Sequence, residues 1–264
     1  MYKNKLSRFN IILILLGGLI LLFIISPLLG MFLATSPKQL FETSKDPEVL
    51  DSIWLTLRVS FLATIFFAIG AIPLSYFLAR TNFKFKKIIN GIIDLPIVIP
   101  HSAAGIAILG FISRDSVLGK LASSVGLNFV GHPAGIALAM AFVSIPFLIN
   151  AARDGFENVP ERLEKTALNL GASPVRAFFT ISLPLAWKNI LSGLIMMFAR
   201  GLSEFGAIVI VAYHPMVTPV MIFERFGAFG LKYARPVSVV FILVCLVFFI
   251  LLRALTKEKE HRNA

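Results

Sequence analysis

Two ionisable side chains, Arg200 and Glu204, interrupt a long apolar stretch of the chain. Their i, i+4 spacing places them on one face of a helix, where they can form an ion pair. In an apolar environment each charge costs about 2.5–3.5 kcal/mol unless it is paired or hydrated. Arg200 could order a helical bundle through this pair, or it could offer positive potential to an anion. The pair is the favoured interpretation, because the carboxylate of Glu204 would repel an anion.

A second group of polar residues follows two prolines in another apolar stretch. Pro96 and Pro100 cannot donate backbone hydrogen bonds, so they should bend or unwind a helix there. His101 and Ser102 come next and could line a gate or a pore, although a bend packed inside a bundle is the alternative. His101 has no acid or second histidine at ligand spacing, so we expect no metal site.

The familiar motifs of nucleotide and hydrolytic chemistry are missing from the sequence. There is no G-x-x-x-x-G-K-[ST] phosphate loop, no H-E-x-x-H, no C-x-x-C and no nucleophile elbow. Cys245 stands alone in an apolar run and is expected to be a packing residue. We therefore expect no catalytic residue and no cofactor on this chain.

The composition indicates the elements that must position these side chains. Of 264 residues, 57% are hydrophobic and 15% are charged, and the mean hydropathy is +0.85. Soluble domains carry about 25% charged residues, so a soluble enzyme, a disordered chain and a disulfide-stapled domain are excluded. A membrane span needs about 20 apolar residues. We predict an all-α polytopic membrane protein whose six transmembrane helices lie within residues 11–33, 59–79, 95–113, 133–152, 189–212 and 236–252.

The basic residues predict the orientation of these spans. With both termini inside, 16 Lys and Arg residues fall on the cytoplasmic side and 7 on the outer side, which follows the positive-inside rule. This bias explains most of the net charge of +11, so no nucleic-acid partner is needed. The first stretch is too long for the apolar part of a signal peptide and is expected to be a signal anchor. The predicted location is the plasma membrane, with cytoplasmic N- and C-termini.

The segment between the fourth and fifth stretches, residues 153–188, is longer than a simple connection requires. Residues 158–161 (NVPE) resemble a capping box with proline in the first helical turn. That helix should end at Gly171 in a left-handed conformation. Ser173 and Pro174 then form an N-cap and first position for a second short helix. We predict two short helices hinged at Gly171.

This segment resembles the EAA loop of ABC-importer permeases, which reads E-A-A, three residues, G, nine residues and I-x-L-P. The matching residues are 165–174 (KTALNLGASP) and 181–184 (ISLP), with Lys165 at the first position and the acid one residue earlier. In type I importers this loop lies between the same two spans and docks on a separate ATPase. The resemblance implies that coupling to the ATPase involves Glu164, Ala167, Gly171, Ala172, Ser173, Pro174, Arg176 and Pro184.

Three further stretches resemble molybdate, tungstate and sulfate permeases. Residues 94–105 (DLPIVIPHSAAG) resemble a D-L-P-x-x-x-P stretch, and residues 199–207 (ARGLSEFGA) resemble A-R-x-x-x-E-F-G-A. Residues 213–219 (YHPMVTP) are most similar to the archaeal-type molybdate/tungstate branch. Candidates for a translocation path or gate are Pro96, Pro100, His101, Ser102, Arg200 and Glu204.

The resemblance implies the type I permease fold and an organisation in three parts. Residues 1–51 hold the N-terminal tail, the first span and an outer loop, residues 52–253 form the transmembrane core, and residues 254–264 are a cytoplasmic tail. The implied function is molybdate/tungstate import by a non-enzymatic subunit, within membrane lipid. Implied partners are a second copy of the chain, two ATP-binding cassette subunits that carry ATP and Mg, and an external oxyanion-binding protein. Two alternatives stay open: a sulfate or thiosulfate permease, and an autonomous channel or membrane enzyme.

Overall fold

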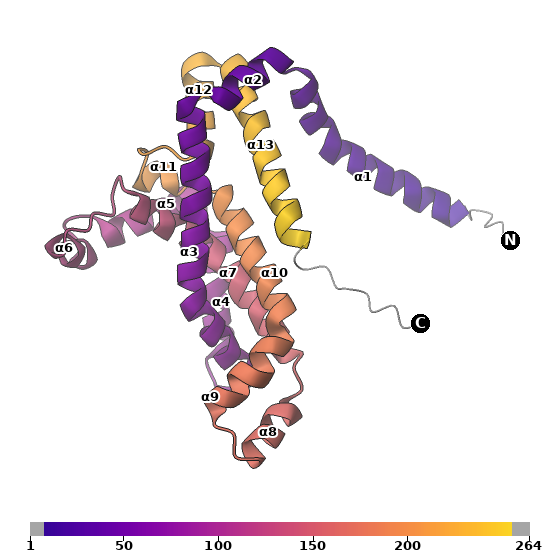
Figure 1. The fold of residues 1–264 in the computed structure, drawn as a ribbon, viewed down its shortest axis with the longest axis vertical. Coiled ribbons are helices and arrows are strands. Elements are labelled where there is room, and N and C mark those ends of the chain that lie inside the picture. Colours follow the sequence, from indigo (N-terminus) through magenta and orange to yellow (C-terminus); the bar gives the residue numbers. More distant parts are fainter. Residues whose placement is uncertain (1–7, 255–264) are drawn as a thin grey trace.

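The computed structural model describes residues 8–254, and every element within them is helical (Figure 1). The elements are α1 (Arg8–Leu33), α2 (Pro37–Lys45), α3 (Pro47–Arg80), α4 (Lys86–Val98), α5 (His101–Ile112), α6 (Val117–Ser124), α7 (Pro133–Glu157), α8 (Glu161–Asn169), α9 (Pro174–Ala177), the π-helical turn η1 (Phe178–Ser182), α10 (Leu183–Leu202), α11 (Ile208–Val211), α12 (Thr218–Phe229) and α13 (Leu231–Ala254). Five basic residues of the predicted cytoplasmic tails lie outside the described residues: Lys3, Lys5, Lys257, Lys259 and Arg262.

The centre of the molecule is a bundle of α3, α7 and α10, with α7 packed against both of the others. Small residues allow the close approach, as is common between membrane helices. At Gly193 of α10, for example, an added Cβ would meet the Cβ of Ala151 on α7 at 2.9 Å. The loop helices α8 and α9 lie at one end of the long axis, and α2 and α12 lie at the other (Figure 1).

The number of membrane spans agrees with the six predicted, if the bent pair α4 and α5 is counted as one span. Five helices are long and apolar enough to cross a membrane: α1, α3, α7, the helix Pro174–Leu202, and α13. The pair α4 and α5 makes up to six. Helix α1 diverges from the bundle (Figure 1), and its apolar side chains are exposed within the protomer. Such a surface is suited to lipid or to another helix.

The third span is broken where the prolines predict a bend. Helices α4 and α5 are related by a 111° bend at Ile99 and Pro100. Ile99 is extended (φ −71°, ψ 145°), which is the conformation favoured before a proline. Pro96 was also expected to bend or unwind the helix, but it is buried inside α4 and does not end that helix. The break is therefore made at Pro100.

The fifth span differs from the prediction of one helix over residues 189–212. The helix ends at Leu202, the chain turns at Ser203, and α11 is a separate short helix. Arg200 therefore lies in the last turn of α10, and the prediction that Glu204 shares its helix is wrong. The turn is held by close packing, since a Cβ at Gly206 would meet His101 Cβ at 2.7 Å.

The first helix of the segment 153–188 has the expected end but a different start. Gly171 follows α8 with φ +87°, the left-handed conformation that glycine tolerates best. The expected capping box is wrong: Asn158 is the C-cap of α7, and Pro160 occupies the N-cap position of α8 without a side-chain cap. The Asn158 side chain therefore does not cap the start of α8.

The second short helix of that segment is also different from the prediction. Ser173 caps it as expected, since its Oγ accepts from the backbone N–H of Arg176 at 3.2 Å, and Pro174 is at its first turn. However, α9 does not end. It continues through η1 into α10, so that Pro174–Leu202 is one helix of 29 residues. The apolar faces on both sides of η1 pack on the same bundle, which favours continuation over a second hinge.

Candidate functional site

Buried polar side chains gather where the segment 153–188 meets the bundle, and we call Tyr76, Arg80, Glu164 and Ser182 the Glu164 cluster. Arg80 donates from Nη2 to Glu164 Oε1 at 2.6 Å and from Nε to both carboxylate oxygens at 3.0 and 3.1 Å. Ser182 Oγ donates to Oε1 at 2.7 Å, and the Tyr76 hydroxyl donates to Oε2 at 3.1 Å. The cluster joins α3, α8 and η1.

The electrostatics of the cluster favour an ionised Glu164. Burial alone would raise the pKa of this carboxyl, whose residue is only 8% exposed. Hydrogen bonds from Arg80 and Ser182, together with the charge of Arg80, outweigh burial and hold the pKa of Glu164 below its usual value. The carboxylate is therefore charged at neutral pH.

The surroundings of the Glu164 cluster fix it in place. Arg80 Nη2 also donates to the carbonyl oxygen of Val159 at 2.9 Å, which attaches the start of the segment. The Tyr76 ring packs edge-on against Phe156 at 5.2 Å and against Phe178 at 4.9 Å between ring centroids. The end of α7 is thus held at the same point as α3, α8 and η1.

The outer surface of the same segment exposes apolar side chains among charged ones. Five large apolar side chains of this segment are exposed within the chain: Leu163, Leu168, Leu170, Val175 and Phe179. Among the predicted coupling residues, Gly171, Ser173, Pro174, Arg176 and Pro184 are exposed as well, whereas Ala167 and Ala172 are half-buried. Glu164 alone of that group faces the interior.

A second polar group lies at the helix break, and we call His101, Arg200, Ser203 and Glu204 the break cluster. Arg200 Nη2 donates to Glu204 Oε2 at 2.9 Å and lies 2.8 Å from His101 Nε2. His101 Nδ1 is 3.3 Å from Glu204 Oε2. The other oxygen of Glu204 accepts from the backbone N–H of Ala207 at 2.9 Å, so this carboxylate caps the turn before α11.

The break cluster is partly open. The Glu204 side chain is fully buried, whereas the side chains of Arg200 and His101 are 21% and 38% exposed. Arg200 Nη1 also donates to Ser203 Oγ at 3.2 Å. The structure therefore brings together three of the predicted path residues, from α5, from α10 and from the turn after α10. Pro100 and Ser102 lie beside them, exposed, at the start of α5.

Several residues of these clusters were not predicted from the sequence. Tyr76 and Arg80 belong to no motif, Ser182 stands at the variable position of the I-x-L-P stretch, and Arg80 counted only as a basic residue at the end of a span. Asp94 was noted only as the first residue of the stretch 94–105. Its carboxylate accepts a hydrogen bond from Asn150 Nδ2 at 2.7 Å and so joins α4 to α7. The contacts of Tyr76, Arg80 and Asp94 link residues more than fifty positions apart, and Ser182 lies 18 positions from Glu164. Local patterns carry no signal for them.

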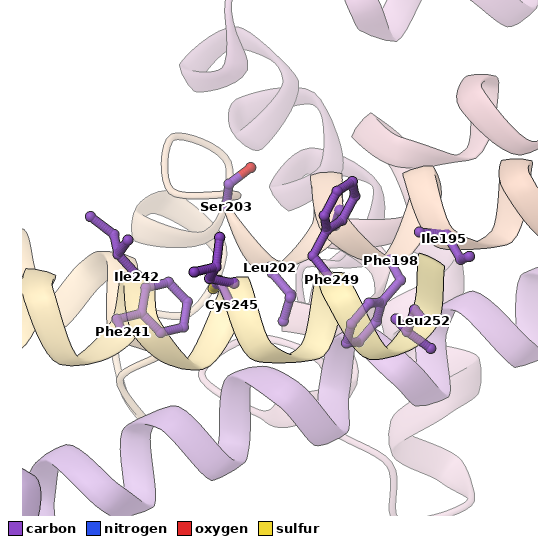
Figure 2. A pocket seen from close by; sticks show the side chains of 11 residues that line it. Ile195, Phe198, Leu202, Ser203, Phe241, Ile242, Cys245, Phe249 and Leu252 are labelled. Atoms are coloured by element: carbon purple, nitrogen blue, oxygen red, sulfur yellow. The ribbon is translucent and has the colours of Figure 1, made fainter. Parts of the chain in front are cut away.

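A groove between α10 and α13 borders the break cluster and lies away from the Glu164 cluster (Figure 2). It has a volume of about 320 Å³ and is lined by apolar side chains that include Phe198, Leu202, Phe241 and Phe249, with Ser203 at its margin. A dianion needs hydrogen-bond donors or positive charge, which this lining does not supply. No three His, Cys, Asp or Glu side chains within residues 8–254 converge as metal ligands.

Comparison with known proteins gives matches over most of the chain. The family described as "Binding-protein-dependent transport system inner membrane component" matches residues 71–260. The molybdate/tungstate transport system permease protein of Methanocaldococcus jannaschii is 42% identical over 248 residues, which cover 94% of this chain and 97% of that protein. A probable sulfate transport system permease protein of Marchantia polymorpha is 32% identical and covers 84% of this chain and 80% of its own length.

A solved structure shows the same fold. The crystal structure of a bacterial ABC transporter involved in the import of the acidic polysaccharide alginate matches with a TM-score of 0.72 and 19% identity, covering 94% of this chain and 95% of that one. The expected type I permease fold is thereby confirmed, and an autonomous channel or membrane enzyme is not supported. The chain is a multi-pass membrane protein that belongs to the binding-protein-dependent transport system inner membrane components, the non-catalytic permease subunits of ABC importers.

Proposed function

We propose that this chain is the permease subunit that carries molybdate or tungstate across the plasma membrane. The observation that supports this cargo most directly is the 42% identity, over 94% of the chain, to a protein named for molybdate/tungstate transport. The lower identity of 32% to a protein named for sulfate transport keeps sulfate or thiosulfate as the second candidate.

The proposed assembly contains two copies of this chain, two ATP-binding cassette subunits and an external oxyanion-binding protein. ATP and Mg would be held by the cassette subunits, because the sequence has no phosphate loop. The exposed apolar residues of the segment 153–188 support docking of a cassette subunit there, since such residues need a partner surface. Both termini are proposed to be cytoplasmic, on the side of this segment.

The proposed path runs along the axis between the two copies and past the break cluster. Pro100 occupies the N-cap position of α5 and provides no side-chain cap, and the first residue of that helix, His101, lies 2.8 Å from Arg200. Open amides at a helix start favour anions. The pairing of Arg200 with Glu204 keeps this attraction modest, which suits conduction because a deep site would slow release.

The cargo is tested by reconstituting the full complex in liposomes with the anion-loaded binding protein and ATP. We expect uptake of tungstate and molybdate that resists an equimolar amount of sulfate. Competition by sulfate as strong as competition by molybdate would support the sulfate alternative. Absence of uptake of all three anions by an assembled, ATP-hydrolysing complex would refute the proposal.

The orientation is tested by labelling single cysteines in intact cells, in a variant in which Cys245 is replaced. A membrane-impermeant reagent should label position 120 or 232, in place of Lys120 or Lys232, and should not label position 86 or 176. These positions represent the two sides of the 16-to-7 distribution of basic residues. Labelling of position 86 or 176 without labelling of position 120 would reverse the orientation.

A further inference from the structure

We propose that Glu164 is a positioning residue that ties the docking helix α8 to α3 inside this chain and does not itself contact the ATPase. The inference rests on the proposed docking of a cassette subunit on the segment 153–188. It differs from the role implied by the motif, in which an acid of this loop couples directly to the ATPase.

The first argument is that the Glu164 carboxylate has no free capacity for an outside partner. A carboxylate offers about four acceptor positions. Oε1 accepts from Arg80 and Ser182, and Oε2 accepts from Arg80 and Tyr76, all within 3.1 Å. With the residue only 8% exposed, a side chain of an ATPase would have to displace one of these internal donors.

The second argument is the position of the cluster relative to the helices. Helix α8 packs against α9 and η1, and Glu164 adds the hydrogen-bonded connection from α8 to α3. A force on α8 therefore reaches α3 through Arg80 and α10 through Ser182. Without Glu164, the force would reach the bundle mainly through the α9 and η1 side.

The third argument is that α3 and α10 are also joined near the break cluster. Ser60 Oγ on α3 donates to the carbonyl oxygen of Phe198 on α10 at 2.9 Å. A Cβ at Gly201 would meet that hydroxyl at 2.6 Å, so the two helices touch there. Arg200 lies in this turn, about 27 Å along the helix from Ser182 at 1.5 Å per residue. Moving α3 and α10 together would thus move the break cluster.

The variant that tests this role is Glu164→Gln, which keeps the side-chain shape and removes the charge. The matched control is Glu161→Gln on the same helix, because Glu161 is exposed and pairs with Lys165 at 2.8 Å. In the reconstituted complex we expect Glu164→Gln to raise the ATP hydrolysed per anion about fivefold, within the range of single-residue coupling effects. The control should leave this ratio equal to that of the parent, because an exposed ion pair contributes little. Equal ratios in the two variants would overturn the proposal.

A distance measurement separates this proposal from the cargo assignment, because it needs the ATPase and no anion. Spin labels are placed at exposed Lys84 and Lys165, on a background without Cys245, in the complex with and without trapped ATP. We expect one narrow distance in both states of the parent and a broadened distribution in Glu164→Gln. An unchanged distribution combined with loss of the ATPase on purification would overturn the proposal in favour of direct contact.

A milder variant keeps the test available if Glu164→Gln folds poorly. Tyr76→Phe removes one donor to the carboxylate and keeps the ring against Phe156 and Phe178. We expect it to raise the ATP-to-anion ratio about twofold, in line with one lost hydrogen bond. A ratio equal to that of the Glu161→Gln control would count against the proposal.

Discussion

The two polar clusters use the same pair of residue types but connect the fold differently. In the Glu164 cluster, arginine and glutamate are 84 positions apart, and the carboxylate receives every side-chain donor from α3 or η1. In the break cluster, Arg200 and Glu204 are four positions apart, and the carboxylate also accepts from the nearby N–H of Ala207. His101 alone brings in another element.

This difference indicates different consequences for the fold. A carboxylate bound by distant residues holds helices together, so its loss should loosen an entire end of the bundle. A carboxylate bound mainly by its own neighbours shapes a turn, so its loss should act locally. The two clusters also differ in exposure: the Arg80 side chain is less exposed than that of Arg200 (12% against 21%), whereas the Glu164 side chain is more exposed than that of Glu204 (11% against 0%).

The largest expected effect is that of Arg80→Ala. This variant leaves the buried Glu164 carboxylate without its ion pair, and breaking such a pair costs about 3–5 kcal/mol. Unfolding of the purified protein in detergent, followed by circular dichroism, measures the loss. Arg176→Ala is the control, because Arg176 is exposed in the same segment and should change stability by about 0.5 kcal/mol at most. Similar losses in the two variants would contradict the comparison.

The break cluster should show a smaller loss that a second substitution repairs. Arg200→Ala strands the buried Glu204 carboxylate, with an expected cost of about 2–3 kcal/mol. The double variant Arg200→Met, Glu204→Leu removes both charges and should recover much of the stability. Unfolding in detergent tests this, and uptake by the well-folded double variant then tests the path. Normal assembly without uptake would move Arg200 from a structural role to the translocation path.

A backbone change near the Glu164 cluster should have a smaller effect still. Gly171 has φ +87°, and a Cβ there would meet no heavy atom within 4 Å. Gly171→Val should therefore cost about 1–2 kcal/mol through left-handed strain alone, and should reduce association with the ATPase while the protein still inserts. Co-purification with the ATPase measures this, and Gly171→Asn is the control, because asparagine tolerates this conformation. Normal transport by Gly171→Val would exclude a coupling role for the hinge.

The smallest expected effect is a dependence of stability on pH. The folded pKa of Glu164 lies below its usual value, because the hydrogen bonds from Arg80 and Ser182 and the charge of Arg80 outweigh burial. The stabilisation is thus complete above the unfolded pKa and is lost as pH falls through the folded pKa. The difference in unfolding midpoint between the parent and Glu164→Gln should be constant near neutral pH and narrow below the unfolded value. A difference that widens on acidification would show that the sign is wrong.

The sequence predicted features that depend on neighbouring residues. The Arg200 and Glu204 pair follows from its spacing, and it forms even though the helix ends between the two residues. The break at Pro100 follows from the missing N–H of proline, and the hinge at Gly171 follows from the φ it allows. In each of these cases the determining interaction lies within about four residues.

Features set by packing between distant segments were not predictable from one sequence. The partners of Glu164 come from α3 and η1. The angle of 111° at the break depends on how α5 lies against the segment before α11, where a Cβ at Gly105 would meet Ala207 Cα at 2.9 Å. The π turn at Phe178–Ser182 has no propensity signal, and Pro184 indicated the start of a separate span where the structure has one continuous helix.

Because of that π turn, the number of residues in the helix determines how α9 and α8 are rotated about the helix axis. A π turn holds about one residue more than an α turn, and each residue advances an α-helix by about 100°. The faces of the helix before Phe178 and after Ser182 are therefore out of phase by roughly that angle. A deletion of one residue here would still leave a continuous helix, but it would rotate α9 and the attached α8 about its axis. The direction in which the docking surface points is thus encoded by the number of residues as much as by their identity.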